Sequence, residues 1–418
     1  MQRAASRSRR GSIYLVVLGA TMLVAVLALS SLMIARVQRR MFDGTADLAQ
    51  ARLCAQSGIE IGLLKIKNNP NWRSDYPSGI WENDRQIGNG GSSYSLEAYN
   101  ANDETIALNA SKWPPVDLKG IGIKDEARHE QVVTLLQRPS PMAALNTCLH
   151  AYGGITMTTG KTITVEGAPL STNGNLSVGI NAKVYGDVQC NTRSGTGLVV
   201  GSTTLGAAPK DRPPGNVIDA YVAMASQLTS TSSIDKKILT PTLNTVGGGL
   251  NPDGCYYLNA PTLTVTLKGT RVHGTLIVKC VTLIVDDAVF LRNYRANYPA
   301  LIVLGNLELK YKSADYGLSE LSWSTNFNPA NADFEGVTDG DANDVYPNEI
   351  QGLVHVTNDL RVQYTPLVRG TIICERNAQF EGLNRIIHNP SLYGNGVFLY
   401  DSPGPLQIVE GSHRQEVE

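Results

Sequence analysis

The sequence predicts an α+β module at the N-terminus, with one long helix and a small antiparallel sheet, followed by an all-β domain that folds as a right-handed parallel β-helix. Three observations lead to this. The one long uncharged apolar run lies at residues 13–35. A helical spacing of apolar residues continues after it. Short β-runs, separated by Gly and Asn, recur through the last two thirds of the chain.

The composition fits an anchor followed by two soluble parts, because 418 residues exceed one typical domain. The 40 Gly residues and an aromatic content of only 6% favour short strands and tight turns over helical bundles. The net charge is −1 and charged residues make up 17% of the chain, without a long like-charge block after the N-terminal arm. We therefore expect no nucleic acid partner.

The first elements are a basic leader, residues 1–11, and a transmembrane segment, residues 13–35. As a helix, these 23 residues extend about 34 Å, enough to cross a bilayer core of about 30 Å. The apolar run is too long for the core of a cleaved secretory signal. The basic leader predicts a cytoplasmic N-terminus and an exported domain, although Arg36, Arg39 and Arg40 weaken the charge asymmetry.

The helix continues beyond the membrane. Apolar residues recur every three or four positions through residues 41–67, at Leu48, Ala51, Ala55, Ile59, Leu63 and Ile66. Such a stripe indicates a helix with one face packed on a domain. We expect one helix over residues 12–67, half in lipid and half on protein.

The strings RRGSIYLVVLGATMLVAVLALSSL and ARLCAQSGIEIGLLKI resemble the N-terminus of type IV pilin-like proteins, especially PilX-type minor pilins and the K-type pseudopilin of type II secretion. The resemblance implies that prepilin peptidase cuts after Gly11 and leaves Ser12 as a methylated N-terminus. It also implies a helix motif, here Ala51, Ala55, Gly58 and Glu60. The sequence departs from the family at Ser12, where Phe or Met is usual, and at Val16, where major pilins carry Glu.

The missing Glu implies a minor or tip subunit instead of a filament-forming one. The implied partners are other pilin-like subunits, inner-membrane assembly proteins and prepilin peptidase. The implied location is the inner membrane, with the main domain periplasmic or on an extracellular pilus, serving assembly, secretion or adhesion. We therefore expect a structural role and not an enzymatic one. An ordinary signal-anchor helix without pilin relationship remains the alternative.

The small sheet is expected within residues 68–138. Residues 68–91 are rich in Asn, Gly and Pro and predict an irregular connection. Alternating patterns then predict strands at residues 94–99, 105–108, 116–123 and 129–136. Two prolines in residues 139–142 indicate a linker to the next domain.

The β-helix-like domain is expected over residues 143–418, with insertions near 211–235 and 311–350. The first insertion should contain a short helix from Val217 to Leu228. Similar β-runs begin 25 residues apart at Leu276 and Leu301, and 19 residues apart at Leu353 and Ile372, as in stacked coils. A β-sandwich is the alternative.

A calcium site is one candidate for chemistry in the second insertion. Asp339, Asp341 and Asn343 match the first three side-chain ligands of an EF-hand loop. The rest of that pattern fails, since Asp344 stands where Gly is needed and Ile350 where Glu is needed. A solvated acidic loop is the alternative, and we expect no other cofactor.

The rival to a pilin-like role is a membrane-tethered protein that binds or cleaves extracellular polysaccharide. Such sites need carboxylates converging in a groove, and several lie near predicted strand ends: Asp286, Asp287, Asp359, Glu375 and Glu381. Carboxylates at turns more often serve solubility. The six cysteines form no C-x-x-C pair, so we expect buried thiols, with disulfides as the alternative outside the cytoplasm.

Overall fold

The computed structural model describes residues 9–69, 72–88, 90–108, 114–312 and 314–416. The chain forms two compact units. Unit 1 comprises Met1–Arg138 and Pro403–Glu418, and unit 2 comprises Pro139–Ser402. The predicted boundary near residue 139 therefore coincides with a structural one. The predicted linker, residues 139–142, is wrong in its conformation, because the strand β4, Ala127–Pro141, continues through most of it. At the other end the structure differs from the predicted limits, because the last residues return to unit 1.

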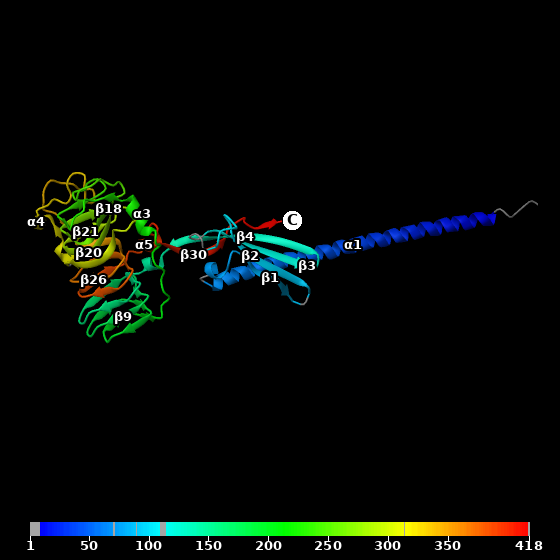
Figure 1. The fold of residues 1–418 in the computed structure, drawn as a ribbon, viewed down its shortest axis with the longest axis horizontal. Coiled ribbons are helices and arrows are strands. Elements are labelled where there is room, and N and C mark those ends of the chain that lie inside the picture. Colours follow the sequence, from blue (N-terminus) through cyan, green and yellow to red (C-terminus); the bar gives the residue numbers. More distant parts are fainter. Residues whose placement is uncertain (1–8, 70–71, 89, 109–113, 313, 417–418) are drawn as a thin grey trace, which may run out of the picture. The chain divides into compact units, whose positions relative to one another are not determined.

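Unit 1 is built on the helix α1, Arg9–Asn68. The predicted single long helix is present, and the strands of unit 1 lie along only its second half (Figure 1). Side chains of the apolar first half are exposed throughout. In the second half the predicted stripe is buried at Ala51, Ala55, Ile59 and Ile66, while Leu48 is 36% exposed. A short helix α2, Trp72–Asp75, follows.

A six-stranded sheet covers this second half of α1, with the order β1-β2-β3-β4-β30 and β31 also paired with β4. Its core contains Ile59, Trp72, Leu118, Val133 and Leu135, among others. The strands are β1, Gly79–Ile87; β2, Ser92–Asn100; β3, Val116–Lys124; β4, Ala127–Pro141; β30, Asp401–Ile408; and β31, Arg414–Glu416.

Three features of this sheet differ from the sequence prediction. Strand β1 occupies residues predicted to be irregular, because its edge position and two register irregularities against β2 tolerate a polar sequence. Residues 105–108 form turns instead of a strand. The C-terminal strand β31 pairs antiparallel with β4, where it places Arg414 opposite Val132.

Unit 2 is dominated by a curled sheet of 23 strands, and the strand pairings described in this sheet are all parallel. Antiparallel hairpins, which a β-sandwich requires, are not among these pairings. The first strands are β5, Leu149–Ala151; β6, Ile155–Met157; β7, Thr162–Glu166; β8, Leu170–Thr172; β9, Asn175–Val178; β10, Lys183–Tyr185; β11, Val188–Cys190; β12, Thr192–Ser194; β13, Leu198–Val200; and β14, Thr203–Leu205.

The remaining strands of this sheet follow the helix α3, Val217–Met224, with α5, Ser391–Gly394, after the last of them. They are β15, Ser226–Gln227; β16, Ser233–Asp235; β17, Ile238–Leu239; β18, Cys255–Lys268; β19, Thr270–His273; β20, Thr275–Asp287; β21, Val289–Arg292; β22, Leu301–Tyr311; β25, Glu349–Val356; β26, Leu360–Val362; β27, Leu367–Cys374; β28, Ala378–Phe380; and β29, Leu383–Ile387.

Aliphatic ladders fill the inside of the curled sheet. One ladder runs through seven consecutive paired strands, and each of its side chains is at most 1% exposed. Its members are Leu276, Leu301, Val354, Ile372, Leu149, Leu170 and Val188. Each buried aliphatic side chain contributes roughly 1.5–3 kcal/mol relative to exposure, so stacking stabilises every coil through its neighbours.

Of the two predicted pairs of repeated residues, one is paired as expected and the other is shifted by one residue. Leu276 pairs with Leu301 as expected. Leu353 pairs with Thr371, and the predicted partner Ile372 pairs with Val354. Successive strand residues point to opposite faces, so this single-residue shift places Leu353 on the outer side of the sheet, where it joins a second buried cluster with Tyr221 and Tyr400.

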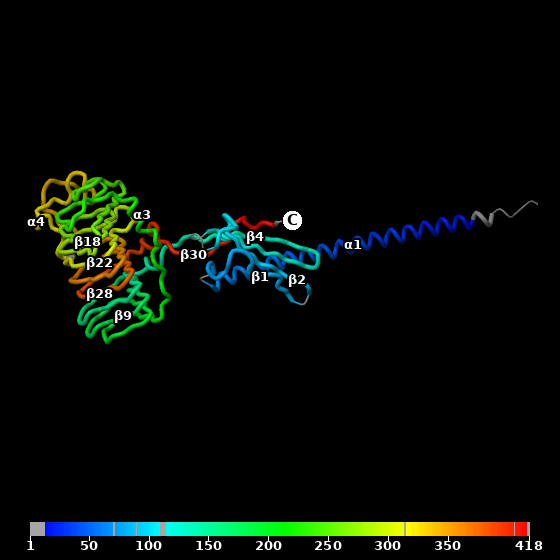
Figure 2. The backbone as a smooth tube through the Cα atoms, in the orientation of Figure 1, coloured from blue at the N-terminus to red at the C-terminus, as the bar shows by residue number. Residues whose placement is uncertain are grey.

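The coils do not stack in chain order. The strands β5, β6 and β7 pair with β27, β28 and β29, so the earliest coil of unit 2 lies against the latest (Figure 2, green around β9 below orange around β28). The chain must then return from β14 at one end of the stack to β15 at the other. Residues 206–225, including α3, make this connection, and α3 packs over Ile277 and Ile302.

The predicted insertion between β22 and β25 is present. It contains a 3-10 turn η2, Ala314–Tyr316; the strands β23, Leu318–Ser319, and β24, Val345–Tyr346; and the helix α4, Glu320–Trp323. Between α4 and β24, residues 324–344 contain no helix or strand. A small core that includes Phe290, Phe327 and Tyr346 holds the insertion on the outside of the sheet.

Candidate functional site

The apolar half of α1 is the first candidate site. It belongs to the described helix long and apolar enough to cross a membrane, with a mean hydropathy of 2.5 over its best window. Large side chains along it are strongly exposed, for example Leu23 at 63% and Val24 at 64%. A soluble surface rarely carries so continuous an apolar patch, which indicates contact with lipid or with other helices.

The predicted processing residues lie in the first turn of this helix. Gly11 and Ser12 fall within α1, which begins at Arg9. Residues 1–8 of the predicted leader lie outside the described residues.

The predicted helix motif is a packing surface. Ala51 and Ala55 are fully buried, and β3 crosses them at Gly120 and Gly122. A Cβ atom at Gly122 would lie 1.9 Å from the Ala51 carbonyl oxygen, and one at Gly120 would lie 2.2 Å from that of Ala55. Backbone therefore meets backbone here, which only small residues on both elements permit.

The remaining two motif residues behave differently from each other. Gly58 is buried, and a Cβ there would lie 3.1 Å from the Tyr94 ring. Glu60 is exposed and accepts a hydrogen bond from Gln56 Nε2 at 3.1 Å. Glu60 is thus available on the surface of the helix, whereas the other three motif residues serve its packing.

The structure divides the candidate carboxylates between separate places. Asp286 and Asp287 line an open cavity of about 580 Å³, with Lys310, Lys312 and two tyrosines, Tyr316 and Tyr364, which are 67% and 61% exposed. Lys312 Nζ lies 2.7 Å from Asp287 Oδ1. The backbone of Tyr364 has a φ of +52°, which lies in the left-handed region. This conformation is energetically unfavourable for a residue with a large side chain.

A second cavity of about 370 Å³ contains Asp359 together with Glu308 and Arg361. Arg361 also pairs with Glu381 at 2.8 Å, and this pairing lowers the pKa of Glu381. Glu375 lies elsewhere, 3.0 Å from His355 Nε2. The five candidate carboxylates therefore do not converge on one point.

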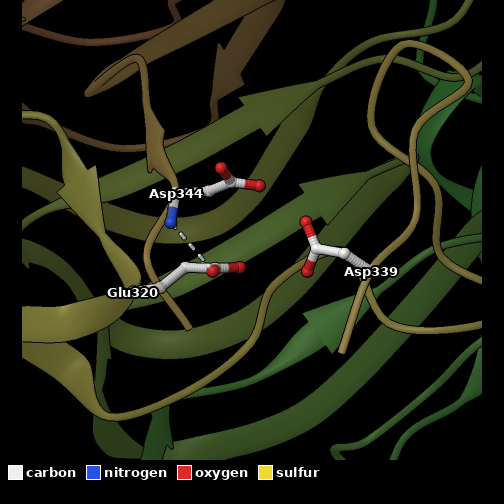
Figure 3. Close-up of side chains that lie close together, drawn as sticks. All are labelled: Glu320, Asp339 and Asp344. Carbon is white, nitrogen blue, oxygen red and sulfur yellow. Dashed lines mark hydrogen bonds between the residues drawn. The ribbon is translucent and has the colours of Figure 1, made fainter. Parts of the chain in front are cut away.

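A cluster of three carboxylates occupies the insertion. Glu320, Asp339 and Asp344 each place an oxygen within 4.8 Å of the other two (Figure 3). Glu320 is fully buried. Its carboxylate accepts hydrogen bonds from the Phe327 N–H, the Asp344 N–H at 3.1 Å and the Tyr346 hydroxyl at 2.9 Å. Desolvation, with the neighbouring Asp339 and Glu320 carboxylates, raises the pKa of Asp344.

Of the predicted calcium ligands, only Asp339 belongs to this cluster. Asp341 and Asn343 form local turns: Asp341 N–H donates to Asp339 Oδ1 at 3.3 Å, and Asn343 N–H donates to Asp341 Oδ1 at 3.0 Å. The sequence pattern missed Glu320, which lies on another element. A clue was present in the capping sequence, because Ser319 caps α4 and its first residue is Glu320.

The six cysteines are all free and buried. Burial raises the pKa of the Cys148 thiol to about 11 and that of Cys374 to about 12. The prediction of buried thiols is thus confirmed, and none of the six is a reactive thiolate.

Comparison with solved structures finds weak similarity to the competence-associated pilin ComZ from Thermus thermophilus. The TM-score is 0.31 at 9% identity, covering 89% of this chain and 98% of ComZ. The DUF3494 domain of an ice-binding protein from Shewanella frigidimarina gives a TM-score of 0.28 at 12% identity, covering 60% of this chain and 99% of that domain.

An ice-binding protein from the Antarctic ascomycete Antarctomyces psychrotrophicus gives a TM-score of 0.27 at 13% identity, covering 59% of this chain and 95% of the other. No protein-family model matches the chain, and no curated protein matches it. Similarities this weak do not establish a family or a function.

Proposed function

We propose that the chain is a minor pilin or pseudopilin-like subunit, anchored in the inner membrane by α1, which presents unit 2 as an exported parallel β-helix for assembly or adhesion. The observation that carries this proposal is the division of α1 into an exposed apolar half and a half packed on an antiparallel sheet. An ordinary membrane anchor needs only the first half. Its partners would be other pilin-like subunits, inner-membrane assembly proteins and prepilin peptidase.

The position of Val16 supports a minor role. Cleavage after Gly11 would make Val16 the fifth residue, where a major pilin would carry a Glu that neutralises the terminal amine of a neighbouring subunit. A valine cannot accept that hydrogen bond or charge. We propose a structural role at a place in the assembly where this contact is not required.

The experiment is N-terminal sequencing of the protein extracted from membranes of cells with and without an active prepilin peptidase. We expect a start at Ser12, with a methylated amine, only when the peptidase is active. A Gly11→Arg variant should remain uncut, whereas Gly19→Ala, with no atom near the added Cβ, should be processed normally. A start at Met1 in both strains would contradict the proposal.

A second candidate function, saccharide binding or cleavage, is favoured by the cavity around Asp286. Exposed aromatic rings beside carboxylates suit a sugar, because the ring covers the apolar face and the carboxylate accepts its hydroxyl hydrogens. Tyr316 and Tyr364 provide such rings. Asp286 is free to accept on its remaining lone pairs, since its carboxylate accepts only the Asp287 N–H within the described residues.

The test is a titration of the purified protein with chitotetraose and with alginate, followed by calorimetry, together with an assay for new reducing ends. Binding that Tyr364→Ala abolishes and Tyr393→Ala retains would support this function, because Tyr393 is 39% exposed on α5, away from the cavity lining. Equal behaviour of the two variants, or no heat with either polysaccharide, would remove it.

A further inference from the structure

The last coil of the curled sheet forms an open end of the stack. This end coil, residues 191–206, contains β12, β13 and β14 and follows the coils around β9 (Figure 1). The registers described for these strands pair β12 with β9, β13 with β10 and β14 with β11. Within the described residues, no register places a further coil on their other side. Their outward N–H and C=O groups are therefore available for pairing.

Side chains that belong inside the stack are exposed at this end. Paired residues of neighbouring parallel strands point to the same side of a sheet. Leu205 pairs with Cys190, which is fully buried inside the curled sheet, yet Leu205 is 61% exposed. Val199 pairs with the fully buried Val184 and is itself only half-buried. The apolar interior of the stack thus opens to solvent beyond the end coil.

The rim of this opening is apolar and nearly uncharged. On the outer side of β13, Leu198 and Val200 are 53% and 44% exposed, and Tyr185, the register partner of Val200, is 39% exposed. Arg193 is the only charged residue among residues 191–206, which include no Pro. Natural proteins protect open strand edges with charges, prolines or a covering segment. An apolar edge with so little protection is typical of an interface.

The opposite end of the stack is covered by its own chain. Residues 240–250 cross the first strands there, with antiparallel bridges from Leu228 to Gly248 and from Leu239 to Asn244. Val246 of this segment packs against the core of the curled sheet. The stack therefore has one capped end and one open end, whereas stacked repeats generally need a polar cap at both for solubility.

The shape of the open end limits what can cover it. A single extended strand would pair with one of the three edge strands and leave the other two, and the interior, exposed. A complete cover requires another coil that presents three strand edges around an apolar opening. In the part of the chain that the structure describes, the other end of the stack does not offer one, because residues 240–250 cover it. The same end of a second copy does.

Two such ends also match in charge and in size. The end coil has no acidic residue and one basic residue, Arg193, so the contact brings together only two like charges. With the neighbouring exposed residues Ile180 and Tyr185, the end coil approaches the roughly 20–30 residues that each partner contributes to a stable interface. Strands related by a two-fold axis run antiparallel, and antiparallel pairs are at least as stable as parallel ones.

We propose that the end coil is the interface through which two copies of this chain join end to end about a two-fold axis. Such a contact uses the same surface on both copies, so it closes after two and gives a dimer. A head-to-tail contact could continue into a filament, but residues 240–250 block it at the other end of the stack. The inference does not depend on the proposed pilin-like role.

The test uses the full-length chain in detergent, with its mass measured by sedimentation equilibrium over a range of protein concentrations. We expect twice the mass of one chain at high concentration. Leu205→Lys should weaken the association about tenfold or more, because like charges from the two copies would meet at the interface. The matched control is Leu250→Lys, since Leu250 is similarly exposed, at 56%, near the capped end. This variant should associate like the unmodified chain.

Hydrogen exchange locates the contact. Amides of β12, β13 and β14 should exchange more slowly as the protein concentration rises, whereas those of β15, β16 and β17 should not change. A chain that stays a single copy at every concentration, or that grows beyond two copies, would overturn the proposal. So would a dimer on which Leu205→Lys and Leu250→Lys have equal effects, because another surface, such as α1, would then hold the copies together. Protected amides in β18, β20 and β22 show that each variant is folded.

Discussion

A buried histidine on the outer side of β5 shows how one residue can make this domain sensitive to acid. His150 is fully buried, and its Nδ1 lies 3.0 Å from Ser171 Oγ, which accepts a hydrogen bond from Lys210 Nζ at 2.9 Å. Burial, with the adjacent Lys210 charge, lowers the pKa of His150 to about 3. The imidazole is therefore neutral in the folded state at neutral pH.

The lowered pKa predicts a loss of stability in acid. Below its usual pKa of 6.5 the unfolded chain binds a proton at His150 that the folded chain excludes until about pH 3. The free energy of unfolding should fall between these values, by at most about 1.4 kcal/mol per pH unit from this residue. Urea denaturation across this range should show a shallower slope for His150→Asn and an unchanged slope for the exposed His413→Asn.

An unchanged slope in His150→Asn would mean that other groups control the acid response. His273 is one such group, because burial, followed by the charge of Arg271, lowers its pKa to about 4. A double variant, His150→Asn with His273→Asn, separates the two contributions.

The acidic residues of the insertion show which part of a site cannot be predicted from the sequence. The sequence pattern predicts that Asp339, Asp341 and Asn343 act together, because alternate positions in a loop resemble a metal-binding motif. The fold instead joins Asp339 to Glu320, a helix residue from the other side of the insertion. A motif records spacing along the chain, whereas a cluster built from two elements depends on tertiary contacts.

At the scale of elements, the contact between α1 and β3 determines how unit 1 packs. Small residues on the helix and glycines on the strand bring the two backbones together. The helix motif was recognisable in the sequence, but its partner was not, since the strand predicted at residues 116–123 does not show by itself that Gly120 and Gly122 face the helix. The motif thus gains a physical reason: a larger side chain at either element would separate them.

Gly122→Ala should destabilise unit 1 by about 1–3 kcal/mol, because the added Cβ would overlap the Ala51 carbonyl and force the backbones apart. Hydrogen exchange of β3 and of the second half of α1 should accelerate. Gly44→Ala is the matched control: nothing lies within 4 Å of its Cβ, and alanine favours the helix by up to about 1 kcal/mol. Similar exchange in both variants would refute the close contact.

The elements that could be predicted are those with a strong local pattern. The long helix α1 has a sustained apolar period, and the prediction of its range is correct to within three residues at the N-terminal end. Strand β1 was missed, because the polar string GIWENDRQI lacks alternation. Residues 105–108 were predicted as a strand and form turns, since so short an apolar run does not specify its conformation.

At the scale of the molecule, the parallel pairing of unit 2 was predictable but the order of its coils was not. Local repeats indicate which segments form coils. They do not indicate that β5 pairs with β27, more than two hundred residues later in the chain. Only the packing of complete coils on each other decides that order.

The reactivity of the cysteine thiols reports whether the whole fold is intact. Four of them lie in the core of the curled sheet: Cys148, Cys190, Cys280 and Cys374. We expect the native protein to be inert to a thiol reagent, and all six thiols to react after denaturation, because burial keeps them protonated and inaccessible. Reductant should leave the unfolding midpoint unchanged. Rapid labelling of the thiols in the native protein would contradict this expectation. So would a protein mass that is lower by two hydrogens for each pair of cysteines, because this loss indicates a disulfide.

The order of the coils also constrains when the domain can fold. If α1 stays in the membrane with its N-terminus in the cytoplasm, as the proposed topology requires, and the rest of the chain is exported in sequence order, β5 to β14 emerge long before β27 to β29. The edge of β5, β6 and β7 that will pair with them stays open throughout this interval, and open parallel edges promote aggregation. Contacts so distant in sequence also form slowly. Export must therefore deliver nearly the entire chain before the stack can close, and any factor that shields the early coils would raise the yield of folded protein.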